Sequence, residues 1–468
     1  MNICKYQILI LGVVCLFVFQ TASAQKSTAP SAQEIEAKVD EYMKAAVELE
    51  PFSGTILIAK DGKPIVSKGY GMANVEFDAP NNPQTVFRLA SVSKQFTAAA
   101  IMILQERGKL NVNDLACKYL AECPASWQPI TIRHLLTNTH GVPGVTALEL
   151  GPLRGLPVPW DQWYEATSKK PLEFTPGEKF KYLNAGYTLL GFIIERVSGK
   201  SYGEFMQENI FTPLGMNRTG YEDPLRIIKN RATGYRKMPD TPMTNLPYRE
   251  IIRMYAAGGI YSTTEDLFLW DQALYTEKLL SKKSIDEMFT PFRDMQPGKG
   301  YAYGWWSSQK FGRRRLAHGG NATGFITYIA RYPEDRVTVI VLSNNERGSA
   351  GKINDVLSAI VFGEKYEIPK EHKAITVASS VLDKYIGEYK FQYPETSYTI
   401  TNENGKLMLL EPGFPKDEMF AESETDFFSK TYDLQIKFVK DANGTVTGLI
   451  VYQNDSTLYE IIDGKKVK

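Results

Sequence analysis

The chain contains few of the residues that commonly bind metals. Its 468 residues include only four histidines and four cysteines, and the histidines show no metal-ligand spacing such as His-Glu-x-x-His. An excess of charge of one sign is also missing, because 54 basic residues face 53 acidic ones and the net charge is +1. We therefore expect no metal or other cofactor, and no nucleic acid or anionic membrane as a partner.

Long apolar runs are absent beyond the first residues of the chain. Lys5 precedes an apolar stretch from Ile8 to Phe19, and Ala22-Ser23-Ala24 follows it as a small-residue cleavage site. The stretch is too short to span a bilayer comfortably and has the order of an export signal. The sequence predicts a signal peptide of residues 1–24, a periplasmic or secreted protein, and no membrane span after cleavage.

Removal of that signal leaves two cysteines, Cys117 and Cys123. They lie close together in the sequence of an exported protein, so a small-loop disulfide fits their spacing. Two free thiols fit it nearly as well. The sequence leaves this choice open, and it gives no indication of an oligomeric state.

The pattern of the remaining chain predicts two structural units. Residues 25–33 are rich in Ser, Ala and Pro and are expected to be disordered. Residues 34–368 show strands first, then a long helical middle, then strands again, which is typical of an α/β (α+β) fold with an antiparallel sheet flanked by helices. The expected elements are helices over 34–49, 93–107, 185–197 and 352–361, a hairpin turning at Asp61-Gly62, and strands over 325–331 and 337–343.

A polar linker over residues 369–376 separates this unit from a tail of different character. The tail, residues 377–468, has short alternating segments, and Leu434, Ile436 and Phe438 alternate with polar residues. Turn signals at Asn404-Gly405, Asn443-Gly444 and Asp463-Gly464 separate the segments. These features predict a small all-β domain, either a barrel or a curved sheet.

Ser91 and Lys94 form a Ser-x-x-Lys motif at the start of a predicted helix. A serine hydroxyl becomes an effective nucleophile only when a base takes its proton. A lysine three residues later returns to the same helix face and lies beside the serine. It would act either as a neutral base or as a cation that lowers the pKa of a phenol. An isolated motif of this kind is more often a helix cap beside a solvated lysine.

Tyr182 and Asn184 precede the next predicted helix. Residues two apart in an extended segment point the same way. A tyrosine can carry a proton when a cation stabilises its phenolate, and an asparagine can bind a substrate amide through both its donor and its acceptor. The competing interpretation is a core tyrosine followed by an asparagine that caps the helix.

His318, Gly319 and Gly320 precede the predicted strand that starts at Phe325. Two glycines let a ligand backbone approach an edge strand closely. A histidine can donate a hydrogen bond or carry charge toward a substrate carboxylate. Taken alone, the triplet is more typical of a turn with a surface histidine.

Together, the three motifs resemble those of the serine β-lactamase and penicillin-binding protein superfamily, most of all the branch of class C β-lactamases, DD-peptidases and esterases. The resemblance covers about residues 35–365, and the tail resembles a small β-barrel-like domain often appended to such hydrolases. Further segments that match the family pattern are Phe87–Ala90, Ile130–Gly141, Pro213–Met216, Ala257–Thr263 and Tyr303–Trp305.

The resemblance implies a sheet flanked by helices, with a largely helical second lobe, and a role for each motif residue. Ser91 would attack a carbonyl and form an acyl-enzyme, while Lys94 and Tyr182 move the proton. Asn184 would contact the amide on the acyl side of the substrate. The backbone amides of Ser91 and Asn321 would form the oxyanion hole.

One motif departs from the family pattern. His318-Gly319-Gly320 stands where the β-lactamases have Lys-Thr-Gly, so a fixed cation and a hydroxyl are missing from the expected substrate-binding strand. This weakens the expectation of efficient β-lactamase activity. We expect a serine hydrolase acting on small peptides or esters, with the D-Ala-D-Ala ends of peptidoglycan as one candidate substrate. The alternatives are a β-lactamase, a carboxylesterase, and a catalytically silent penicillin-binding sensor whose tail binds the ligand.

Overall fold

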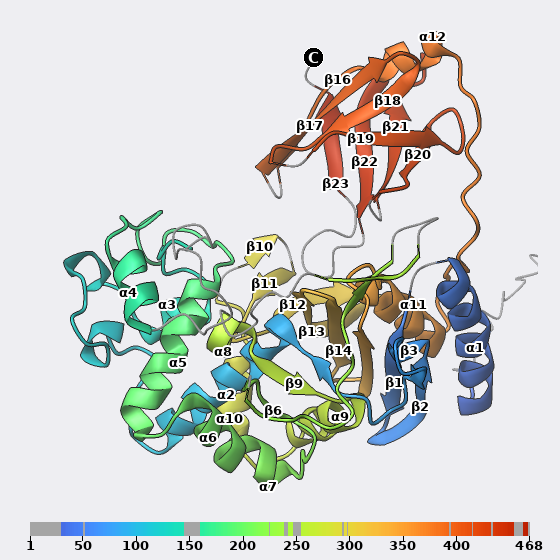
Figure 1. Cartoon of the computed structure of the whole chain (residues 1–468). Helices are drawn as coiled ribbons and strands as arrows, with labels where there is room; N and C mark the ends of the chain where they lie inside the picture. Colours follow the sequence, from blue (N-terminus) through green and yellow to red (C-terminus); the bar gives the residue numbers. More distant parts are fainter. Residues whose placement is uncertain are drawn as a thin grey trace, which may run out of the picture.

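The structure of the chain is a computed structural model (Figure 1). It describes residues 30–49, 52–144, 160–223, 225–237, 242–246, 254–292, 294–296, 298–392, 395–413, 415–431, 434–453 and 462–466. The predicted signal peptide of residues 1–24 lies outside these ranges. In the part of the chain that is described, no helix is both long enough and apolar enough to cross a membrane.

An antiparallel sheet of eight strands forms the centre of the larger unit, in the order β10-β11-β12-β13-β14-β15-β1-β2. Its strands are β1 (Gly54–Lys60), β2 (Lys63–Tyr70), β10 (Asp294–Gln296), β11 (Lys299–Tyr301), β12 (Trp306–Lys310), β13 (Arg313–Ala322), β14 (Phe325–Tyr332) and β15 (Val337–Ser343). Along β1, Ile56 and Ile58 enter one apolar core while Leu57 and Ala59 enter another. Because strand side chains alternate in direction, both faces of the sheet are buried.

Helices α1 (Ala32–Leu49) and α11 (Ala350–Phe362) pack together over one face of the sheet (Figure 1). The expected disorder over residues 25–33 is wrong for Ala32 and Gln33, which are helical. The Ser31 hydroxyl accepts a hydrogen bond from the Glu34 amide, and the Glu34 carboxylate accepts one from the Ser31 amide. This capping box starts the helix earlier than the apolar pattern indicated.

The other face of the sheet meets a helical lobe, which contains most of the remaining helices (Figure 1). These are α2 (Ser93–Glu106), α3 (Ile132–Leu136), α4 (Trp160–Ser168), α5 (Asn184–Ser198), α6 (Tyr202–Met206), α7 (Thr212–Leu214), α8 (Tyr255–Gly258), α9 (Thr264–Ala273) and α10 (Lys282–Met288). The predicted α/β architecture with a helical second lobe is confirmed.

Helix α2 lies deeper than its sequence pattern predicts. We expected one apolar face, but every residue from Ser93 to Leu104 is buried. The reason is that α5, α8 and α10 surround it, so even its polar side chains leave water. A helix buried on all sides places any lysine it carries in an environment of low dielectric constant.

Short paired segments and one disulfide complete the larger unit. The small sheets are β3 (Met72–Asn74) with β4 (Ala79–Pro80), β9 (Ile260–Ser262) between β5 (Phe87–Arg88) and β6 (Gly220–Tyr221), and β7 (Tyr235–Arg236) with β8 (Thr244–Asn245). Cys117 and Cys123 form a disulfide in the connection between α2 and α3. Of the two alternatives left open by the sequence, the structure contains the disulfide.

The tail is a closed antiparallel barrel preceded by α12 (Ser379–Leu382). Its strands are β16 (Gly387–Gln392), β17 (Glu395–Glu403), β18 (Lys406–Leu410), β19 (Asp417–Ala421), β20 (Asp426–Ser429), β21 (Leu434–Lys440), β22 (Val446–Gln453) and β23 (Ile462–Lys466). Asn404-Gly405 turns the chain with positive φ angles of 56° and 81°. Asp463-Gly464 was predicted as a turn, but the pair lies inside β23, where pairing with β22 outweighs its local turn preference.

Large side chains fill the interior of the barrel. Tyr385 stacks on Phe438 with ring centroids 4.0 Å apart, and Tyr389, Phe391 and Phe427 belong to the same buried cluster. A barrel of this size has an interior just wide enough for its own side chains. The expected small all-β domain is confirmed, and its described interior is a packed core.

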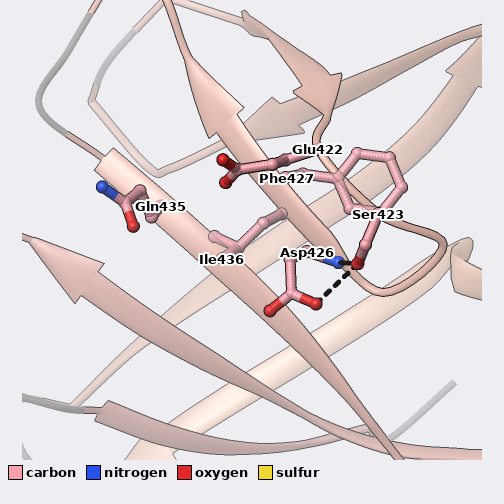
Figure 2. A pocket seen from close by; sticks show the side chains of 6 residues that line it. All are labelled: Glu422, Ser423, Asp426, Phe427, Gln435 and Ile436. Atoms are coloured by element: carbon pink, nitrogen blue, oxygen red, sulfur yellow. Dashed lines mark hydrogen bonds between the residues drawn. The ribbon is translucent and has the colours of Figure 1, made fainter. Parts of the chain in front are cut away.

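A shallow pocket lies on the barrel between β20 and β21 (Figure 2). Its acidic groups are engaged within the domain: the Ser423 hydroxyl donates to the Asp426 carboxylate at 2.6 Å, and Glu422 lies 3.1 Å from His372 Nδ1. His372 also stacks on Phe428 with ring centroids 4.9 Å apart. The end of the predicted linker is therefore attached to the barrel.

We predict that a chain ending at Pro369 folds without the barrel. The cut removes His372 together with the barrel that it contacts. It keeps α11 and the eight-stranded sheet complete. Because each unit has its own core, the melting temperature of the shortened protein should change by no more than about 4 °C. Calorimetry of the shortened and full-length proteins checks this, and a shortened protein that only aggregates would show that the barrel completes the main core.

Candidate active site

Ser91 lies in a one-turn 3-10 helix, Ala90–Val92, directly before α2. Ala90 has a left-handed φ of 48°, which is costly for a residue with a side chain. The Ser91 side chain is buried, with 8% of its surface exposed. A strained residue next to a predicted nucleophile indicates that the surrounding packing holds this turn in place.

Lys94 lies one helical turn further along and is fully buried. Its Nζ is 3.0 Å from Ser91 Oγ, 2.8 Å from Asn184 Oδ1 and 2.8 Å from the carbonyl oxygen of Ala257. Burial lowers the pKa of Lys94 well below its usual value. Desolvation therefore favours the neutral amine over the ammonium form at the contact with the serine.

Tyr182 packs against the same lysine. Lys94 Nζ lies 4.9 Å from the centre of the Tyr182 ring. Burial raises the pKa of the Tyr182 phenol, and the neighbouring Ser91 hydroxyl opposes that rise. The phenol therefore stays protonated at neutral pH, and it lies next to both Ser91 and Lys94.

Asn184 is the first residue of α5, and its side chain does not cap the helix. Its Oδ1 accepts the hydrogen bond from Lys94, while the residue as a whole is exposed. The alternative role as a helix cap is therefore excluded. The amide joins the buried lysine to the exposed part of the site.

His318 is fully buried in β13, where the sequence allowed a surface turn. Its Nδ1 lies 2.6 Å from the Gly319 carbonyl oxygen, which can only accept, so Nδ1 carries the proton. Nε2 lies 3.1 Å from the Tyr301 hydroxyl and accepts from it. Burial, together with the nearby Lys94, lowers the pKa of His318 to about 3. The hydrogen bond expected to reach a substrate carboxylate is thus made inside the protein.

The second half of β13 faces the Ser91 turn. Strand β12 pairs with β13 only as far as Ala317, whereas Gly320 and Asn321 pair with β14 alone. A Cβ atom at Gly320 would lie 2.1 Å from the Leu89 carbonyl oxygen and 3.1 Å from the Ser91 amide nitrogen. The expected edge is present, but Gly320 is needed for close packing against this turn rather than for approach by a ligand. Asn321, one residue further, is exposed.

Two residues of the site, Ala257 and Tyr301, were not identified from the sequence. The Ala257 carbonyl contacts Lys94, but any residue supplies a carbonyl, so the side chain gave no signal. Tyr301 lies two residues before the matched segment Tyr303–Trp305, and its contact with His318 depends on pairing between β11, β12 and β13. Only that adjacency in the sequence could have pointed to Tyr301.

Comparison with known families and proteins gives a consistent result. The Beta-lactamase family model matches residues 35–360, and a domain of unknown function, DUF3471, matches residues 371–466. Penicillin-binding protein 4* of Bacillus subtilis (strain 168) is 32% identical over 441 residues, which is 87% of this chain and 94% of that protein. The putative penicillin-binding protein PbpX of the same organism is 30% identical over 356 residues, 72% of this chain and 82% of that protein.

Solved structures with the same fold include two penicillin-binding protein relatives. The octameric penicillin-binding protein homologue from Pyrococcus abyssi has a TM-score of 0.64 and 26% identity, covering 93% of this chain and all of that one (100%). The penicillin-binding protein from Bacillus halodurans has a TM-score of 0.57 and 29% identity, covering 71% of this chain and 99% of that one. The chain therefore belongs to the Beta-lactamase family of serine hydrolases, and its relatives include proteins named as penicillin-binding proteins.

Proposed function

We propose that this protein is an exported serine hydrolase that cleaves small peptides or esters through an acyl-enzyme on Ser91. The observation that carries the proposal is the contact of 3.0 Å between Ser91 Oγ and the buried Nζ of Lys94. A buried amine next to a hydroxyl is the arrangement that activates a serine nucleophile. The predicted signal peptide supports export to the periplasm or beyond.

The hydrogen bonds of Lys94 are compatible with its action as the base. A neutral amine has two N–H groups and one lone pair. Asn184 Oδ1 and the Ala257 carbonyl oxygen can only accept, so they take the two N–H groups. In the neutral amine, the lone pair would then face the Ser91 hydroxyl; in the ammonium form, the third N–H group would donate to Ser91 Oγ instead. Of the two roles that the sequence left open for Lys94, burial, which lowers its pKa, supports the neutral base.

Tyr182 then serves as the proton donor to the leaving group. Its raised pKa keeps the phenol protonated until a departing oxygen or nitrogen takes the proton. Lys94, which gained the proton of Ser91, can return it to Tyr182. The backbone amides of Ser91 and Asn321 would stabilise the oxyanion, and the Nδ2 group of Asn184 would donate to the acyl side of the substrate. Water then releases the acyl group and restores Ser91.

The environment of His318 favours substrates without a carboxylate next to the cleaved bond. A β-lactam and a D-Ala-D-Ala end both carry that charge, whereas a neutral ester or internal amide does not. Because His318 is neutral and both its nitrogens are engaged, it offers no charged hydrogen bond to an anion. We therefore place esters and amides with neutral leaving groups ahead of β-lactams and D-Ala-D-Ala ends.

The rival proposal of a silent sensor has less support. It needs a ligand site in the tail, but the described interior of the barrel is packed with its own aromatic rings. A sensor role also does not explain why Lys94 is buried, although burying a lysine costs free energy. Catalysis accounts for that cost.

Ser91→Ala should abolish turnover of p-nitrophenyl esters and covalent labelling by an acylating agent. Loss of a nucleophile that works as a unit with its base costs about a million-fold in rate. Intact-mass measurement after labelling is the check, with Ser93→Ala as a matched control on the same helix turn. If Ser91→Ala still gained the same added mass from the label as the wild type, Ser91 would not be the nucleophile.

Lys94→Ala should lower kcat/KM by several orders of magnitude. In the wild type, kcat/KM should fall as the pH decreases, because a protonated lysine cannot accept the proton of Ser91. Burial lowers the pKa of Lys94, so this loss of activity should occur at a pH well below the usual lysine pKa of 10.5.

The pH–rate profile with a p-nitrophenyl ester tests this expectation. Tyr182→Phe should lower the rate at every pH without moving the pH at which activity is lost. A rate that reaches its plateau only near pH 10.5 would contradict a neutral lysine base.

His318→Lys should shift activity toward substrates that carry a carboxylate. If its amine is charged at this buried position, a lysine adds the cation that His318 lacks, and one charged hydrogen bond corresponds to about a ten- to hundred-fold change. The readout is the ratio of kcat/KM for a chromogenic cephalosporin to that for a neutral ester at pH 7.5. His318→Gln, which adds no charge, should not raise the ratio. If the wild type already prefers the cephalosporin strongly, the protein is a β-lactamase.

A further inference from the structure

Four aromatic rings, including that of Tyr182, form a cluster beside the candidate active site. Tyr182 lies nearly parallel to Trp306, with centroids 6.4 Å apart and an angle of 18° between the rings. Phe180 packs edge-on against Trp306 at 5.6 Å and lies 5.7 Å from Tyr301. Tyr301 in turn packs edge-on against Tyr182 at 5.9 Å. We call these four residues the aromatic wall.

The aromatic wall has a buried layer and a partly exposed layer. Trp306 and Tyr301, from β12 and β11, keep only 7% and 2% of their surface exposed. Phe180 and Tyr182 lie over them and are half-buried. The outer face that a bound molecule can meet is therefore formed by Phe180 together with Tyr182.

The segment that carries Phe180 and Tyr182 is held in an extended form. The Lys181 amide donates to the Asn138 carbonyl oxygen at 3.0 Å, and the Leu183 amide donates to Asn138 Oδ1 at 3.1 Å. Because alternate residues of an extended segment point the same way, Phe180 and Tyr182 share one side. Lys181 is exposed and pairs with Glu173. Because its side chain points to the opposite side of the segment, the charge of Lys181 lies away from the aromatic wall.

The chemistry at Tyr182 determines which part of a substrate meets the wall. The bond between the carbonyl carbon and the leaving group breaks, and the leaving oxygen or nitrogen takes its proton from Tyr182. The leaving atom must lie within hydrogen-bond reach of that hydroxyl. If its substituent extends along the Tyr182 ring, Phe180 is the other partly exposed ring of the wall that it can meet, because both rings pack on Trp306 and Tyr301. The acyl part of the substrate lies on the side of Asn184.

We propose that Phe180, supported by Trp306 and Tyr301, forms a leaving-group subsite for neutral aromatic groups. This inference rests on the proposed function, because it uses Tyr182 as the proton donor. The subsite takes the aryl alcohol of an ester, or the amine of an aromatic amide, and binds it by edge-to-face and stacked ring contacts. It therefore selects the group that departs, not the group that acylates Ser91.

Two pairs of esters test the subsite. Phenyl acetate and trifluoroethyl acetate share an acyl group but differ in their leaving group, whereas p-nitrophenyl acetate and p-nitrophenyl butyrate share a leaving group. Phe180→Ala should lower kcat/KM for phenyl acetate about three- to tenfold more than for trifluoroethyl acetate. The acetate to butyrate ratio should not change. Phe180→Tyr, which keeps the ring, should restore the preference for the phenyl ester.

The outcomes separate this inference from the proposed function. Equal losses with both alcohols in Phe180→Ala would show that Phe180 only packs the site, and this would overturn the subsite while leaving Ser91 chemistry in place. A change in the acetate to butyrate ratio would place Phe180 on the acyl side and overturn it as well. Activity that persists in Ser91→Ala would refute the proposed function itself. Melting temperatures of each variant confirm that the compared proteins are folded.

Discussion

The burial of one amine, Lys94 Nζ, determines much of the architecture around it. A lysine leaves water only when polar atoms replace its hydration and the surrounding elements exclude solvent. Asn184 at the start of α5 and the Ala257 carbonyl in α8 supply those atoms, and both helices pack against α2. The helical lobe is thus arranged around a group whose pKa it must lower. Helices α2, α5 and α8 together form the low-dielectric environment of the Lys94 amine.

The same arrangement contains local costs. Ala90 adopts a left-handed conformation, and the edge of β13 approaches the Ser91 turn so closely that only glycine fits at position 320. Thr327 in β14 donates to the Leu89 carbonyl oxygen at 2.8 Å, which fastens the turn to the sheet. Strain at a reactive residue persists only when its surroundings fix it. Here β13 and β14 of the sheet restrain the Ser91 turn on one side. Helices α2 and α8 of the helical lobe also pack against it.

Much of this was accessible from the sequence because the relevant signals are local. Ser91 and Lys94 are one helical turn apart, and Asn404-Gly405 forms its turn with backbone angles that suit both residues. The errors arose where tertiary structure decides. Asp463-Gly464 has turn residues but pairs as a strand. His318 is buried, and its ring packs against Tyr182 and Tyr301 from other parts of the chain. The capping box of Ser31 and Glu34 was a local signal that we missed. Contacts made by backbone carbonyl groups, such as that of Ala257 with Lys94, cannot be recognised from the residue types in the sequence.

The docking of His372 on the barrel also sets the length of the free tether between the two units. Helix α11 ends at Phe362, and the chain forms no helix or strand again until Ser379. Because His372 stacks on Phe428 and the Ile375 amide donates to the Ala421 carbonyl oxygen, the second half of this connection moves with the barrel. Glu364 pairs with Arg313 and Tyr366 packs on the core beneath α1 and α11, so the first residues of the connection belong to the larger unit. The free part, from Glu367 to Glu371, spans at most about 18 Å when fully extended. If the barrel were bound to a surface, a tether of this length would keep Ser91 close to it, and the concentration of substrate at that surface would then matter more than that in bulk solution.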